Sequence, residues 1–137
     1  MSLNIIQDMA DFHKHYGVKA KTLTLSKEHL REYLDFRFRF LEEELNEGKK
    51  AVASGNAEEI VDSLIDLVVV ALGTLDAYDV DAQQAWEEVY RANMNKKVGV
   101  KSSRPNPFGL PDLIKEPGWK APDHTGNHGI IPKAYEK

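Results

Sequence analysis

The distribution of proline is the feature that most limits how this chain can fold. None of the first 104 residues is a proline, and all six prolines lie between Pro105 and Pro132. Proline inside a helix removes a backbone hydrogen bond and costs about 3 kcal/mol, so a long proline-free stretch is compatible with long helices. Five of the nine glycines also lie between Gly99 and Gly129. The sequence therefore predicts a helical domain, residues 1–98, and an irregular C-terminal tail, residues 99–137.

Helical periodicity and capping residues divide the first 98 residues into four expected helices. Apolar residues recur at helical spacing, and strand signals are scarce. Gly17 is typical of a helix end, whereas Ser26 and Asp81 are typical N-caps. The expected helices cover about residues 5–16, 27–53, 57–78 and 81–98. We therefore expect an all-α fold, a four-helix bundle followed by the tail.

Composition excludes several classes of protein. The chain has no cysteine, so it can form neither a disulfide scaffold nor a thiolate metal site. The longest apolar stretch, Leu64–Leu75, has twelve residues and contains Asp66, whereas a membrane span needs roughly 20. The net charge is −4, and no basic stripe is interleaved with aromatic residues. We expect a cytoplasmic protein without a secretory signal and without nucleic-acid or membrane partners.

Acidic residues on the second and third expected helices predict a metal site. Glu43, Glu44 and Glu47 form an EExxE pattern, whose spacing places them on neighbouring rows of one helix face. Asp62 and Asp66 repeat the i,i+4 spacing on the next helix, which a short loop makes antiparallel to the first. Partly buried carboxylates repel one another unless a cation compensates them. All five are therefore candidate ligands of a hard cation, Mg²⁺ or Mn²⁺.

The alternative is that these acids form an ordinary solvated helix face. That interpretation suits the Glu-rich stretch by itself, but Asp66 interrupts the apolar run LIDLVVVAL, where a solvated aspartate is hard to explain. The five histidines show neither HExxH nor EExxH spacing, which argues against a zinc hydrolase and a di-iron bundle. We expect His13 and His15 to be partly exposed structural residues.

The second and third expected helices also carry two apolar faces each. One seam on each helix is purely apolar, and the opposite strip mixes Phe or Val with the acids. The two apolar seams are Leu34, Phe38, Leu41 and Leu45, and Ile60, Leu64, Leu67, Ala71 and Leu75. One layer of four helices cannot bury both faces of each helix, so we expect self-association.

Three stretches together resemble a known family. RFRFLEEELNEG, EEIVDSLIDLVVVALGTLDAYDVD and WEEVYRANMNKKVG occur in this order, with IKEPGWKAPD in the tail. They resemble the MazG-like, all-α NTP pyrophosphatase superfamily, and are most similar to its phosphoribosyl-ATP pyrophosphohydrolase-like branch of bacteria and phages. The resemblance implies a homodimer or homotetramer that cuts the α–β phosphate bond of nucleoside triphosphates with Mg²⁺.

The resemblance also implies roles for individual residues. Glu43, Glu44 and Glu47 match the EExxE glutamates, and Asp66 matches the aspartate of an ExxD motif. Glu44 or Glu47 is the candidate general base that orients or deprotonates the attacking water. The residues that match family contacts to phosphates or sugar are Arg37, Asn93 and Lys96.

One position departs from the family pattern. Ser63 occupies the place of the ExxD glutamate, and we expect Asp62 to supply the missing carboxylate. Two alternatives to a nucleoside triphosphate pyrophosphohydrolase stay open at this point. One is a phosphoribosyl-ATP pyrophosphohydrolase. The other is a non-catalytic helical module that binds a metal or a nucleotide.

Overall fold

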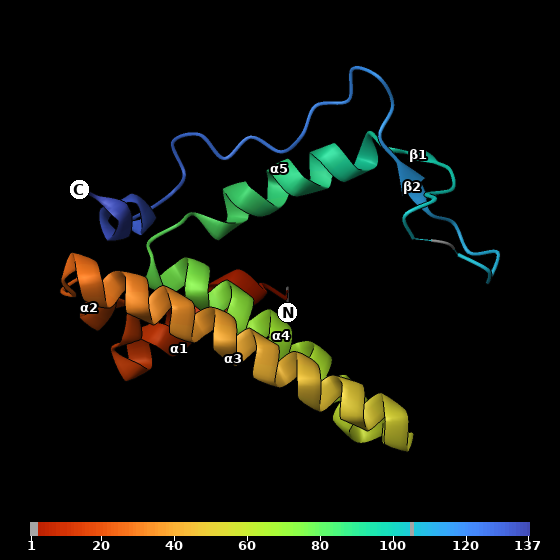
Figure 1. Ribbon diagram of the computed structural model, residues 1–137. Coiled ribbons are helices and arrows are strands. Elements are labelled where there is room, and N and C mark those ends of the chain that lie inside the picture. The colour runs from red at the N-terminus through yellow and green to blue at the C-terminus, as the bar shows by residue number, and fades with distance from the viewer. Residues whose placement is uncertain (1–2, 105) are drawn as a thin grey trace. The chain divides into compact units, whose positions relative to one another are not determined.

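The chain is mainly α-helical, as the sequence predicts. The computed structural model (Figure 1) describes residues 3–104 and 106–137. Its α-helices are α1 (Ile5–Tyr16), α2 (Val18–Thr22), α3 (Lys27–Ser54), α4 (Ala57–Ala77) and α5 (Ala82–Met94). Strands β1 (Lys97–Val98) and β2 (Leu113–Ile114) pair antiparallel, and a 3₁₀ helix, η1 (Ile131–Tyr135), follows near the C-terminus.

The four predicted helices are confirmed, and their ends follow the expected caps. Gly17 ends α1 with a φ of 70°, and Ser26 caps α3 by accepting a hydrogen bond from the backbone N–H of His29 at 3.2 Å. The sequence did not predict α2, the β1–β2 pair or η1. Each of these elements has five residues or fewer, which is too short for a periodic pattern to be recognised. Two of these elements, β2 and η1, lie in the predicted tail, residues 99–137, so the tail is not irregular throughout.

The structure divides into two compact units. Unit 1 comprises the chain up to Ala82 together with Asn127–Lys137, and unit 2 comprises Gln83–Gly126. These units differ from the predicted domains 1–98 and 99–137, because α5 groups with the hairpin that follows it. The last eleven residues belong instead with the N-terminal helices.

Helices α3 and α4 form an antiparallel hairpin, which is the long helix pair in Figure 1. Gly55 ends α3 with a φ of 68°, and Asn56 caps α4 by accepting a hydrogen bond from the backbone N–H of Glu59 at 3.1 Å. The helices approach closely at Gly48, where an added Cβ would lie 3.3 Å from the Cβ of Ser63. Small residues on the two helices therefore allow this close approach.

The predicted apolar seams are only partly covered in a single chain. Phe38 is 63% exposed, Leu64 is 60% exposed, and Leu45 is also exposed. Between α3 and α4 these seams border an apolar groove of about 330 Å³. A single chain therefore leaves a large apolar surface on its central hairpin.

The C-terminal segment packs back onto unit 1. Leu30, Ala77, Tyr78 and Ala134 are fully buried together, and the Tyr78 hydroxyl donates a hydrogen bond to the Leu30 carbonyl oxygen. Burial raises the pKa of Tyr78 to about 12. The Asn127 side-chain amide closes this arrangement by donating to the Asp81 carbonyl and accepting from its backbone N–H, both at 2.8 Å.

Within unit 2, the segment after β2 runs back along α5. The Trp119 indole N–H donates to the Ala92 carbonyl oxygen at 2.8 Å, and Arg91 donates to the Ala121 carbonyl oxygen at 3.1 Å. The backbone N–H of Asp123 donates to the Glu88 carboxylate at 3.0 Å. Unit 2 is thus held mainly by hydrogen bonds from α5 to an extended segment.

Candidate metal and nucleotide site

The hairpin of α3 and α4 brings four of the five predicted metal ligands together. Glu44 and Asp66 are half-buried, and Glu47 and Asp62 are exposed beside them. Each of the four influences the ionisation of at least one other, so they lie close in space. We call Glu44, Glu47, Asp62 and Asp66 the carboxylate cluster.

Ionisation of the carboxylate cluster is disfavoured at its two least exposed members. Burial raises the pKa of Glu44 above its usual value, and the negative charges of Glu47, Asp66 and Asp62 raise it further. Burial also raises the pKa of Asp66, followed by the charge of Asp62 and a hydrogen bond with it. Both shifts have the sign expected of carboxylates that lack a compensating cation.

The donor set of the carboxylate cluster fits a hard divalent cation. The Oε2 atom of Glu44 is shielded from solvent and has no hydrogen-bond partner. A carboxylate oxygen without a partner is costly in such a position. The other members of the cluster offer further carboxylate oxygens, the type of ligand atom that Mg²⁺ prefers. Among the described residues, no three His, Asp or Glu side chains are arranged as a ready ligand set. The side chains would therefore have to close around an ion.

Glu43 and Ser63 occupy different surroundings. Glu43 is exposed and is not among the main groups that shift the pKa of Glu44 or Asp66. Ser63 is only 3% exposed and faces Gly48 across the helix contact. A glutamate at position 63 would have to place its carboxylate in this tight contact, which leaves Asp62 as the nearby acid that can reach the cluster.

Arg37 bridges the two helices of the hairpin. Its Nε donates to the Thr74 hydroxyl at 2.9 Å, and its Nη2 donates to the Val70 carbonyl oxygen at 2.9 Å. Its guanidinium also lies 5.8 Å from the ring centroid of Phe40. Sequence reasoning missed these contacts, which fix the register of α3 against α4 and thereby the position of the carboxylate cluster.

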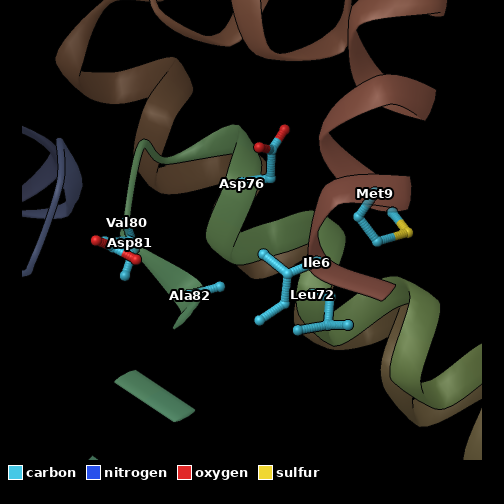
Figure 2. A pocket seen from close by; sticks show the side chains of 7 residues that line it. All are labelled: Ile6, Met9, Leu72, Asp76, Val80, Asp81 and Ala82. Carbon is cyan, nitrogen blue, oxygen red and sulfur yellow. The ribbon is translucent and has the colours of Figure 1, made fainter. Parts of the chain in front are cut away.

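His13 joins α1 to the same region, and the expectation of a partly exposed histidine was wrong for it. His13 is 2% exposed, and its Nδ1 lies 2.9 Å from an Asp76 carboxylate oxygen on α4. Asp76 also lines a cavity of about 150 Å³ between α1 and the end of α4 (Figure 2).

An added Cβ at Gly73 would lie 3.1 Å from His13 Nε2 and 2.8 Å from Arg37 Nη2. Glycine is therefore needed where α1, α3 and α4 converge.

Replacing His13 by Gln should reduce the loss of stability that the protein suffers in mild acid. Burial lowers the pKa of His13 below 6.5, although Asp76 opposes the shift and the Arg37 charge adds to it. The unfolded chain therefore binds the proton more readily, so stability falls as the pH drops below about 6.5 towards the folded-state value. Urea unfolding at pH 7.5 and pH 5.5 should show a smaller difference in the variant. An equal difference in both proteins would contradict this assignment to His13.

The remaining predicted residues, Asn93 and Lys96, belong to unit 2. Asn93 is exposed near the end of α5, and Lys96 is half-buried just before β1. The Lys96 ammonium lies 5.4 Å from the ring centroid of Trp119. Both residues are polar groups of the kind that contact phosphate or sugar oxygens.

The fold and the cluster together define an all-α protein with an acidic site on a helix hairpin. Residues 9–93, more than half of the chain, match the phosphoribosyl-ATP pyrophosphohydrolase family. The chain belongs to this family, which is part of the MazG-like all-α superfamily. It is accordingly a pyrophosphohydrolase, a hydrolase of phosphoric anhydride bonds in nucleotides.

The matched segment contains the whole carboxylate cluster, together with Arg37 and Asn93, whereas Lys96 lies just beyond it. No curated protein sequence matches the chain significantly. No helix within residues 3–104 and 106–137 is long and apolar enough to cross a membrane.

Proposed function

We propose that this pyrophosphohydrolase is Mg²⁺-dependent and cleaves the α–β phosphate bond of ribo- or deoxyribonucleoside triphosphates. The products are a nucleoside monophosphate and pyrophosphate. The observation that carries the proposal is the unpartnered Glu44 oxygen among three further carboxylates. Glu44, Glu47, Asp62 and Asp66 would hold the ion, and the exposed Glu43 would join them as the remaining EExxE glutamate. Mn²⁺ has the same ligand preference and should substitute.

Individual side chains have separate roles in the hydrolytic step. Glu44 or Glu47 orients a water molecule and accepts its proton as general base. The water oxygen forms a bond to the α-phosphorus, and the bond from that phosphorus to the bridging oxygen breaks, so pyrophosphate leaves with the bridging oxygen. When bound, the Mg²⁺ offsets the negative charge on the α-phosphoryl group and the leaving pyrophosphate, and lowers the pKa of the water.

Three further residues complete the proposal. Lys96 and Asn93, both of unit 2, are proposed to contact phosphate or sugar oxygens of a nucleotide, Lys96 as a point charge and Asn93 as a neutral donor. Arg37 already donates two hydrogen bonds to α4. Its contribution to substrate binding is therefore made from a guanidinium that the helix hairpin holds rigid.

Phosphoribosyl-ATP is the second candidate substrate, because the matching family is described by that activity. It presents the same α–β anhydride with an additional phosphoribosyl group on the base. Family membership selects these two enzymatic functions over the non-catalytic helical module.

The experiment that tests the proposal is a panel of substrates with three metal conditions. The purified chain is incubated with each dNTP, each NTP and phosphoribosyl-ATP, in Mg²⁺, in Mn²⁺ and in EDTA. We expect pyrophosphate and monophosphate from at least one triphosphate with either metal, and no product in EDTA. Orthophosphate as the first product, or undiminished turnover in EDTA, would contradict the proposal. Turnover of phosphoribosyl-ATP alone would select the second candidate.

We also propose that the exposed apolar face of α3 and α4 is covered by further copies of the chain in a dimer or tetramer. A single chain leaves Leu45 and Leu64 exposed beside the apolar groove and Phe38 exposed elsewhere on α3, and so much exposed apolar surface is unusual on a monomer. Sedimentation velocity of the full chain should give a dimer or tetramer, and Leu64→Glu should shift it towards monomer. A wild-type monomer at micromolar concentration would contradict the assembly.

A further inference from the structure

Unit 2 differs from the rest of the chain in the sign of its charge. Residues 83–126 carry seven Lys or Arg and five Asp or Glu, a net charge of +2, whereas the whole chain carries −4. The remainder of the chain is therefore at −6. Such an acidic surface repels a highly charged anion at long range. Any attraction of the protein for a phosphate chain, apart from that of a bound metal, has to come from basic groups such as those of unit 2.

Two lysines of unit 2 share one indole ring. The Lys115 ammonium lies 5.0 Å and the Lys96 ammonium 5.4 Å from the ring centroid of Trp119. The indole N–H of Trp119 donates a hydrogen bond to the Ala92 carbonyl oxygen, which holds the ring in place. Each cation is attracted by the ring, so two positive charges are held beside the same indole.

The carboxylates of unit 2 do not neutralise this pair. Glu116 pairs with Lys97 at 3.2 Å, and Asp112 pairs with Arg104 at 2.7 Å. Glu88 pairs with Arg91. Within the described part of the chain, neither Lys96 nor Lys115 has a carboxylate within ion-pair distance. The two ammonium groups therefore lack an anion although acids are available nearby in sequence.

A polar cavity lies against the same ring. It has a volume of about 300 Å³ and is bounded by Arg91 of α5, by Asn95 just after this helix and by the segment 116–120. Lys120 adds a further ammonium to its wall, whereas the Glu116 carboxylate in that wall is paired with Lys97. This volume lies at the lower end of the range for small-molecule sites. It offers charged and amide donors rather than an apolar lining.

We propose that unit 2 carries an anion site of its own at Trp119, which binds the phosphate chain of a nucleotide through Lys96 and Lys115. A di- or triphosphate has several negative oxygens along its length, so it can offset more than one of these positive charges. Lys120 and Asn95 supply further donors from the cavity. The identification of the anion as part of a nucleotide rests on the proposed function, whereas the presence of an anion site does not.

The test measures binding of inorganic tripolyphosphate in EDTA, so that no metal can link the anion to the carboxylate cluster. The background is Trp86→Phe, which leaves Trp119 as the single indole of the chain. Fluorescence reports on the ring, and titration calorimetry reports on affinity. We expect a saturable change in emission, with an affinity that falls as KCl is raised. Lys96→Gln and Lys115→Gln should each weaken binding roughly 3- to 10-fold.

Lys101→Gln is the matched control, because it removes the same charge from the same unit away from Trp119. It should leave the affinity within about twofold of the parent, since distant screened charges contribute little. Unchanged emission of the ligand-free variants would show that their fold is intact. Equal affinity in Lys96→Gln, Lys115→Gln and the parent, or no binding by either method, would overturn the anion site.

The two proposals fail independently. Pyrophosphate release that persists while tripolyphosphate does not bind at Trp119 would overturn the anion site alone. Tripolyphosphate binding that depends on Lys96 and Lys115, in a protein that releases no pyrophosphate from any substrate, would support the site and overturn the proposed function.

Discussion

Replacing Glu44 by Gln will lower the rate of pyrophosphate release by about 10²- to 10³-fold, as expected for loss of a charged group that acts in the transition state. The same substitution will raise the melting temperature of the protein in EDTA. Glu44 has a raised pKa because of its burial and the charges of Glu47, Asp66 and Asp62, and its Oε2 has no partner. The glutamine amide keeps the shape, removes the repulsion and can donate to a neighbouring carboxylate.

Opposite effects on activity and stability would separate a ligand from a structural residue. Glu42→Gln is the matched control, because this exposed glutamate lies on the same helix outside the cluster. It should change neither activity nor melting temperature appreciably. If Glu44→Gln loses activity and melts at a lower temperature, Glu44 supports the fold instead. Full activity in Glu44→Gln would contradict its place at the metal.

The same experiment can be made with Asp62→Asn, because Ser63 stands where the family pattern has a glutamate. The close contact of Ser63 with Gly48 leaves little room there for a longer acid, and we propose that Asp62 supplies the carboxylate one turn before Asp66. Asp62→Asn should therefore abolish turnover with little change in stability, because Asp62 is exposed. Undamaged activity would refute its assignment as a ligand.

The sequence predicts most of the helices because their ends are determined locally. Gly17, Ser26 and the Gly55–Asn56 turn each act through their own backbone conformation or a hydrogen bond to a residue three positions away. The carboxylate cluster could be predicted for a related reason. Its members lie one turn apart on two helices that a short loop joins as a hairpin, so their spacing indicates that they face one another. The same spacing also included Glu43, which is not in the cluster.

The contacts that hold the site in position could not be predicted in this way. His13 meets Asp76 across 63 positions of sequence, and Arg37 meets Thr74 across 37. A single polar residue on a helix carries no signal about a partner so far away. The apolar seams are visible as patterns in the sequence, but the patterns do not say where the two backbones approach closely, at Gly48 and Ser63. The position of this close approach depends on how the side chains of the two helices interdigitate in three dimensions.

Replacing Gly129 by Ala will detach the C-terminal segment from unit 1. Gly129 adopts a φ of 55°, and an added Cβ would lie 1.9 Å from the Tyr78 carbonyl oxygen, a backbone atom that cannot move aside. That oxygen also accepts the hydrogen bond of the Ile130 backbone N–H at 2.8 Å. The clash therefore separates η1 from the fully buried core around Tyr78 and Ala134. We expect about 3 kcal/mol or more of lost stability, of the size that other disrupted cores show.

Gly126→Ala is the control that separates the steric clash expected in Gly129→Ala from the backbone strain of a positive φ. Gly126 has a φ of 80°, but an added Cβ there meets no atom within 4 Å. Its substitution should cost only the conformational penalty of a left-handed residue, about 1 kcal/mol. Urea unfolding measures both variants, and hydrogen exchange over residues 127–137 locates the change. Rapid exchange in this segment of Gly129→Ala, with slow exchange in Gly126→Ala, would establish that the close approach at Tyr78 holds η1 in place. Equal destabilisation of the two variants would instead assign the whole effect to the positive φ and contradict a tight contact at this carbonyl.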